Sequence, residues 1–368
     1  MQLEHLQVGE LAAGQPLTIP VYRFKGTSHK APSVYIQANV HGAEVQGNAV
    51  ILQLLQYFKA HPPLGDVTLV PLANPLGINQ KSGEFTLGRF DPITGINWNR
   101  AYLEQVVHLD DWYPQYSELP EQALFDAFRQ LLIANCEQAL ANPWGVTTGQ
   151  RLALNLQKLA HGADIVLDLH TGPKSCKHLY CPEYELSAAG YFHIPYTLVM
   201  PKGFGGAMDE AAFNPWWQLS DYAKSRVRDL KVAVSAFTLE LGSQERIDLA
   251  DASRDAEGIL SYLSYREVIA QSVLPQVMPR FACLLKDYRK FHAPMAGMVE
   301  YLAKPGVPLS AGAPLVNILR LDRVDVGTEV TKLSLEEDVI PVLHFASASV
   351  HQGTELYKVM TNYFTLSD

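Results

Sequence analysis

A buried strand that ends in a glycine turn constrains the fold of this chain more than any other stretch. Residues 34–44, VYIQANVHGAE, begin as an apolar strand and end in a turn that carries His41 and Glu44. A helical pattern begins at once in residues 47–55. In an open α/β sheet, ligands bind at the carboxyl ends of strands, so both side chains could face one ion there. Alone, the pair could equally be a helix start with a favourable acid in its first turn.

A second strand pattern supplies a third candidate ligand. Residues 163–172, ADIVLDLHTG, again form an apolar run that ends in a histidine, His170, shortly before a glycine. Two histidines and one glutamate form the ligand set of several catalytic zinc sites, which keep a fourth position open for water. Asp168 lies two residues earlier, on the same side of the strand, and could orient an imidazole N–H. It could also cap or pair within the core.

The order of elements predicts an α/β fold with two domains. Strand patterns alternate with helical ones along most of the chain, which indicates a mixed, mostly parallel sheet flanked by helices. From about residue 291, short strands are separated by glycine and proline, as in an all-β unit. We therefore expect a larger α/β domain over residues 1–285 and a small C-terminal β-domain over residues 286–368.

Charge and composition exclude several functions. The net charge of −9 and the pI of about 5.7 argue against nucleic-acid binding. No apolar run approaches the roughly 18 residues that a membrane span needs, and no signal-peptide pattern is present. The four cysteines lack metal-knuckle or redox spacing, which favours reduced thiols and a cytoplasmic protein.

Two further regions carry candidate site residues. Glu240 lies in an apolar strand pattern, residues 231–242, where an unpaired carboxylate would cost several kcal/mol. It must therefore be paired, bound to a metal or functional, and beside activated water it could serve as a base. Residues 79–102 form a long irregular stretch that includes Arg89 and Arg100, and loops of this length are often functional.

Taken together and in this order, these motifs resemble the succinylglutamate desuccinylase/aspartoacylase family of the zinc carboxypeptidase-like superfamily. The resemblance covers about residues 30–250. It rests on HGAE at residues 41–44, the Asn99-Arg100 pair, the strand that ends at His170, and TLELG at residues 238–242.

The resemblance implies a role for each matching residue. One Zn²⁺ per subunit would be held by His41, Glu44 and His170. Asn99 and Arg100 match the pair that holds the carboxylate of the substrate. Arg89 would polarise the scissile carbonyl, and Glu240 matches the general base.

Two departures from the family pattern concern the details of the site. Asn97 stands where the family usually has an aspartate before its Asn-Arg pair, and Ala43 stands where aspartoacylases usually have an asparagine. The C-terminal stretch resembles a biotinyl/lipoyl-like β-domain. Residues 295–298, MAGM, lack the lysine of an attachment site, which argues against a swinging-arm carrier.

The expected function is that of a zinc-dependent hydrolase that removes the acyl group from an N-acyl amino acid or a similar small amide. A zinc carboxypeptidase acting on short peptides is the alternative within the enzymes, because both need a carboxylate clamp. A non-catalytic binding protein of the same fold is the alternative outside them. The expected partner is a small molecule rather than nucleic acid or a membrane. The acyl group, the amino acid and the oligomeric state, including a homo-oligomer, stay open.

Overall fold

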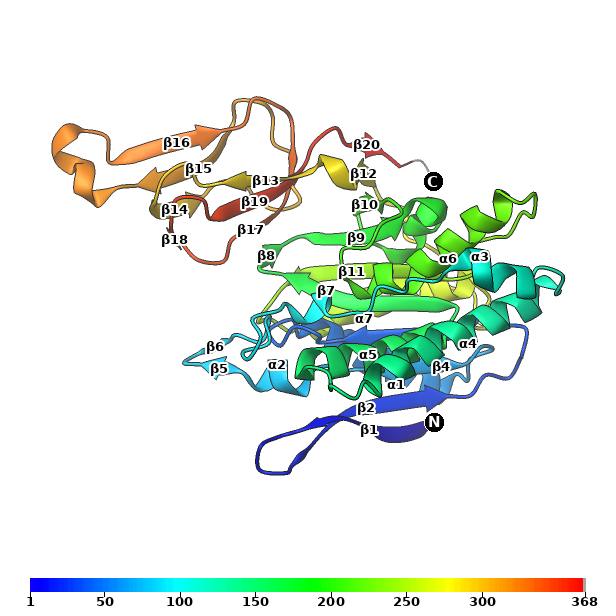
Figure 1. Ribbon diagram of the computed structural model, residues 1–368. Helices are drawn as coiled ribbons and strands as arrows, with labels where there is room; N and C mark the ends of the chain where they lie inside the picture. The colour runs from blue at the N-terminus through cyan, green and yellow to red at the C-terminus, as the bar shows by residue number, and fades with distance from the viewer. Residues whose placement is uncertain (367–368) are drawn as a thin grey trace.

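A large mixed sheet forms the centre of the computed structural model, which describes residues 1–366 (Figure 1). Within these residues ten strands pair in the order β1-β2-β4-β3-β7-β11-β9-β10-β12-β20. The four central strands β4, β3, β7 and β11 run parallel to one another. The strands are β1 (Gln2–Glu10), β2 (Pro16–Phe24), β3 (Val34–Ala38), β4 (Val67–Val70), β7 (Ile165–Gly172), β9 (Lys177–Pro182), β10 (Tyr196–Met200), β11 (Ser235–Ser243), β12 (Phe281–Leu284) and β20 (Phe364–Thr365).

Helices cover both faces of this sheet. The longer ones are α1 (Gln46–Ala60), α4 (Glu121–Leu140), α5 (Thr148–His161), α6 (Met208–Lys224) and α7 (Leu249–Tyr265). The shorter elements are α2 (Pro75–Asn79), α3 (Leu109–Trp112), η1 (Trp98–Arg100), η2 (Tyr113–Gln115) and η3 (Glu183–Phe192), with a hairpin of β5 (Lys81–Ser82) and β6 (Phe85–Thr86). Helices α1 and α7 pack in one core cluster, and α4, α5 and α6 pack in another.

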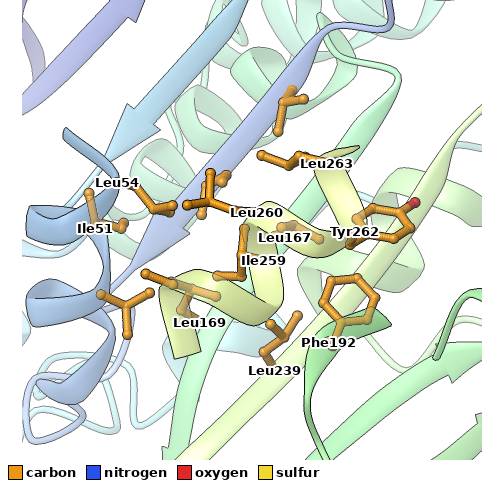
Figure 2. Close-up of a cluster of buried hydrophobic side chains, with 14 of the residues drawn as sticks. Ile51, Leu54, Leu167, Leu169, Phe192, Leu239, Ile259, Leu260, Tyr262 and Leu263 are labelled. Carbon is orange, nitrogen blue, oxygen red and sulfur yellow. The ribbon is translucent and has the colours of Figure 1, made fainter. Parts of the chain in front are cut away.

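Alternation along the central strands assigns each side chain to one of the two cores. In β7, Leu167 and Leu169 belong to the core under α1 and α7, whereas Val166 belongs to the core under α5 and α6. Figure 2 shows Leu167 and Leu169 packed among side chains of α1 and α7. Asp168 and His170 therefore lie on the side of Val166. The same alternation in β11 puts Glu240 on that face, the face that α6 covers.

The C-terminal part forms two small antiparallel sheets at one end of the large sheet (Figure 1). One sheet has the order β13-β19-β17-β8 and the other β16-β15-β14-β18. Their elements are β8 (Lys174–Ser175), β13 (Tyr288–His292), β14 (Gly297–Tyr301), β15 (Pro314–Leu319), β16 (Val330–Ser334), β17 (Ile340–His344), β18 (Ser349–Val350) and β19 (Glu355–Met360), with the helical turns η4 (Leu285–Asp287) and η5 (Leu321–Val326).

The two parts share strands and a core. Strand β8, which follows β7, pairs with β17 of the C-terminal part. A separate apolar cluster joins Leu198 and Cys283 of the large sheet to Val342 and Met360. Strand β20 returns to the large sheet beside β12. The domain boundary near residue 285 therefore stays a prediction. Strand β8 lies before it in sequence but pairs with the C-terminal part, and β20 lies after it but pairs with the large sheet.

The fold class predicted from the sequence is confirmed, because a mostly parallel central sheet is flanked by helices and followed by small antiparallel sheets. Among the described residues, no helix combines the length and the apolar character that a membrane crossing requires. Strand β7 pairs with β3 on one side and with β11 on the other, all in parallel. The carboxyl ends of these three strands therefore lie next to one another at one edge of the sheet.

Candidate active site

The glycine turn after β3 brings His41 and Glu44 to this edge. Asn39 adopts a left-handed conformation with φ 67°, and its side-chain amide donates hydrogen bonds to the carbonyl oxygens of His41 and Gly42. A Cβ atom at Gly42 would lie 2.0 Å from the carbonyl oxygen of Gly77. Glycine is therefore required at that position, and the tight turn directs both candidate ligands toward the end of β7.

The three predicted metal ligands converge on one point. Nδ1 of His41 lies 2.8 Å from Oε1 of Glu44, and Nδ1 of His170 lies 2.8 Å from Oε2 of the same carboxylate. One ligand atom from each residue lies within 4.8 Å of the others, and all three residues are buried. Zinc bonds to nitrogen and oxygen are about 2.0–2.2 Å long, so an ion between these atoms would reach all three after small shifts.

Each imidazole is held through its other nitrogen. Nε2 of His41 lies 2.8 Å from Oδ1 of Asn97, and Nε2 of His170 lies 2.8 Å from Oδ2 of Asp168. Asn97 Oδ1 also accepts a hydrogen bond from the backbone N–H of Asn99. A carbonyl or carboxylate oxygen accepts, so each Nε2 carries the proton. This leaves Nδ1 of both rings as the atom that could bind a metal.

The electrostatics of the group suit a cation. Burial alone raises the pKa of Glu44, but the His41 and His170 imidazoles outweigh it and hold this pKa well below its usual value. Burial lowers the pKa of His41. For His170, burial is outweighed by the Asp168 carboxylate and by Glu44, which raise its pKa well above the usual value. A buried acid with two imidazoles could therefore hold a divalent ion such as zinc.

A cavity of about 380 Å³ opens beside these ligands. Glu240 lines it, and its Oε2 atom has no hydrogen-bond partner within residues 1–366. Burial and the Glu44 carboxylate raise the pKa of Glu240 to about 7. The C-terminal part also contributes to the cavity wall, through Leu343, Phe345, Ala346, Glu355 and Lys358.

The predicted substrate-binding residues line the same cavity. Nη1 of Arg89 lies 3.0 Å from Oε1 of Glu44, so this guanidinium contacts a candidate metal ligand directly. The Oδ1 atom of Asn99 accepts a hydrogen bond from the N–H of Met208, which leaves its Nδ2 group, 3.3 Å from Nε2 of His170, as a donor for a substrate. Arg100 is exposed and forms no ion pair within residues 1–366. Its Nη1 donates to the carbonyl oxygen of Asn99, which leaves its other N–H groups available for a substrate.

Three polar residues of this region are not among the ligands and site residues predicted from the sequence. In the sequence, Asn97 differs from the family pattern, but nothing there indicates a contact with His41. The two residues are 56 positions apart in the chain, so no local spacing predicts this contact. Asp209 and Lys358 line the cavity, one from the start of α6 and one from β19. No local pattern marks either of them, because their positions depend on how α6 and the C-terminal part pack against the sheet.

The fold and the site together define an α/β protein with a His-Glu-His group at adjacent strand ends that could hold a metal ion. A family model for the succinylglutamate desuccinylase/aspartoacylase catalytic domain matches residues 30–266. The chain therefore belongs to the succinylglutamate desuccinylase/aspartoacylase family, whose hydrolases act on amide bonds.

Solved structures agree with this assignment. A protein of this family from Shewanella amazonensis is 68% identical, with a TM-score of 0.98 over 100% of both chains. A second, from Shewanella frigidimarina, is 63% identical, with a TM-score of 0.98 over 99% of this chain and 98% of the other. A succinylglutamate desuccinylase/aspartoacylase from Rhodobacter sphaeroides shares the fold at 19% identity, with a TM-score of 0.70 over 100% and 96% of the two chains. Among curated proteins no match was found.

Proposed function

We propose that this protein is a zinc-dependent hydrolase that cleaves the amide bond of an N-acyl amino acid or a similar small amide. The observation that carries the proposal is the meeting of three buried ligands beside a carboxylate without a partner. Nδ1 of His41, Nδ1 of His170 and the Glu44 carboxylate face one point, and Glu240 lines the cavity next to it. These three ligands would hold the zinc ion.

The chemistry divides among the residues as follows. When bound, zinc would act as a Lewis acid and lower the pKa of water toward about 7. Glu240 would take a proton as the water oxygen adds to the carbonyl carbon, and would return it to the nitrogen as the C–N bond breaks. The products are a carboxylate and a free amine. Arg89 would stabilise negative charge on the carbonyl oxygen. Such electrostatic stabilisation is often the largest single contribution to the rate enhancement.

Arg100 would bind the carboxylate of the amino-acid part. A guanidinium can hold a carboxylate through two parallel hydrogen bonds, which fixes the direction of the substrate. Asn99 would support the clamp by contact through its Nδ2 group and indirectly, since its Oδ1 accepts the N–H of Met208 in the first turn of α6.

A zinc carboxypeptidase acting on short peptides is the second candidate, because it needs the same ligands and the same clamp. A panel of N-acyl amino acids and dipeptides, assayed with zinc-loaded protein of measured metal content, separates the two. We expect release of the free amine from N-acyl amino acids at a kcat/KM at least ~10-fold higher than for dipeptides. The reverse order would favour the carboxypeptidase. A protein that binds no zinc and cleaves neither class would instead be a binding protein of this fold.

A further inference from the structure

A buried carboxylate in the cavity lacks a positively charged partner. Asp209 is the second residue of α6, lines the cavity and has only 2% of its surface exposed. Its Oδ1 atom accepts a hydrogen bond from the backbone N–H of Glu210 at 2.9 Å. No lysine, arginine or histidine within residues 1–366 forms an ion pair with it. A buried ion without a counter-charge is costly, so this position calls for an explanation.

The start of helix α6 uses only part of the Asp209 carboxylate. Its Oδ1 atom accepts the N–H of Glu210, while the Glu210 carboxylate accepts hydrogen bonds from the N–H groups of Gly205 and Ala207 ahead of the helix. Burial and the Glu210 carboxylate raise the pKa of Asp209 to about 7. One backbone hydrogen bond does not offset the burial of a carboxylate, and this carboxylate lines the cavity.

Thr238 provides a second, independent polar group at the same place. Its side chain is 6% exposed and lines the cavity, and its hydroxyl has no hydrogen bond of good geometry within residues 1–366. The hydroxyl is nevertheless close enough to Asp209 to oppose, weakly, the rise in its pKa. Thr238 precedes Glu240 by two residues in β11, so both side chains point to the same face of the sheet. A hydroxyl that faces a carboxylate keeps lone pairs with which it can accept a hydrogen bond from a ligand.

The acidic position lies next to the proposed carboxylate clamp. The N–H of Met208, immediately before Asp209, donates to Oδ1 of Asn99 at 3.3 Å. A Cβ atom at Gly206 would lie 3.3 Å from the Cα atom of Arg100. The first turn of α6 therefore packs directly on the clamp. One small cavity thus offers a guanidinium that forms no ion pair within residues 1–366 and, close by, a buried carboxylate with a hydroxyl beside it.

We propose that Asp209 and Thr238 bind a cationic group on the amino-acid part of the substrate, so that the substrate is an N-acyl derivative of a basic amino acid. The ammonium group would pair with Asp209 and donate to the Thr238 hydroxyl, while the α-carboxylate lies on Arg100. An acidic side chain would meet the Asp209 carboxylate at the same position and would be repelled. This inference rests on the proposed function for the identity of the cleaved bond, but the cation subsite itself can be tested by binding.

The test uses matched pairs of substrates that differ in one charge. Zinc-loaded protein is assayed with Nα-acetylornithine against N-acetylnorvaline, and with Nα-acetyllysine against N-acetylnorleucine. A hydrogen bond between charged groups corresponds to roughly a 10- to 100-fold higher kcat/KM for the basic compound than for its uncharged analogue. We expect this ratio for whichever of the two basic compounds reaches Asp209 better. Asp209→Asn should reduce that ratio to within about threefold of unity, because the amide keeps the shape and loses the charge. Asp221→Asn, which removes an acid from the exposed side of the same helix, should leave the ratio unchanged.

The same ratio is measured for binding of free ornithine and norvaline by calorimetry, which does not depend on cleavage. A preference for the basic compound that disappears in Asp209→Asn supports the subsite. Absence of a preference in the unmodified protein, or a preference that survives Asp209→Asn, overturns it and makes Asp209 a structural acid. If no amide is cleaved, the proposed function fails, and the binding ratio still decides for or against the subsite.

Discussion

Replacing Asn97 with alanine should weaken zinc binding although Asn97 is not a candidate ligand. Its Oδ1 atom accepts two hydrogen bonds, from Nε2 of His41 at 2.8 Å and from the backbone N–H of Asn99 at 2.9 Å. The first fixes the tautomer and the direction of the His41 ring. The second holds the turn on which Asn97 itself lies. Alanine removes both, and His41 can then rotate away from the point that it shares with Glu44 and His170.

The size of the effect follows from these two contacts. A hydrogen bond of this kind contributes about 0.5–1.5 kcal/mol net, so the loss of two corresponds to about 1–3 kcal/mol. Since 1.4 kcal/mol is a factor of ten, the zinc dissociation constant should rise by roughly 5- to 150-fold. This agrees with the 10- to 100-fold typical of residues that orient a metal ligand from behind.

Competition with a chromophoric chelator at fixed pH gives the dissociation constant directly. Asn142→Ala is the matched control, because Asn142 also accepts a backbone hydrogen bond, from Trp144, but in an exposed turn remote from the cavity. Asn97→Asp should bind zinc at least as tightly as the unmodified protein, since a carboxylate accepts the His41 proton more strongly. An Asn97→Ala protein that is folded and binds zinc within twofold of the unmodified protein would refute the orienting role.

Three other changes test separate parts of the site and the core. Glu240→Gln should lower kcat by ~100-fold or more while the zinc content stays the same, because only proton transfer is lost; normal turnover would exclude it as the base. His170→Ala should abolish zinc retention in elemental analysis, and full metal content would remove it from the ligand set. Burial lowers the pKa of His161 to about 3, from an ordinary value of 6.5. The folded protein keeps this imidazole neutral, so its contribution to stability is complete above pH 6.5 and is lost as the pH falls toward 3. At pH 5 this group costs the unmodified protein about 2 kcal/mol of its free energy of unfolding. In denaturant titrations at pH 7.5 and pH 5, His161→Gln should therefore lose less stability between the two pH values than the unmodified protein does. An equal loss in both proteins would contradict the prediction.

The meeting of His41, Glu44 and His170 was predictable from the sequence because its signals are local. Each candidate ligand follows an apolar strand, and parallel strands in an open sheet end at the same edge. The tight turn at Gly42 also follows from the sequence pattern, and the reason for the glycine is the close approach of the Gly77 carbonyl oxygen. Asp168 is likewise where strand alternation puts it, with its carboxylate 2.8 Å from His170.

The remaining walls of the cavity could not be predicted in this way. Asp209 belongs to a helix whose amphipathic pattern says nothing about the direction of its first turn. Lys358 comes from the C-terminal part, and its position depends on the pairing of β8 with β17. Both residues reach the cavity through contacts between segments that are distant in the sequence. Residue spacing and periodicity within one element do not predict such contacts.

The contribution of the C-terminal part to the cavity bears on the choice between a small amide and a peptide as substrate. Phe345 and Lys358 line the same space as Arg100 and Glu240, so the C-terminal part forms one wall of the site. Lys358 is half-buried in this wall, and burial lowers its pKa. A cavity of about 380 Å³ lies at the lower end of the roughly 300–1,000 Å³ range of small-molecule pockets. A wall on this side leaves less room for an extended peptide than for an N-acyl amino acid lying between Arg100 and the three candidate metal ligands, which favours the small amide.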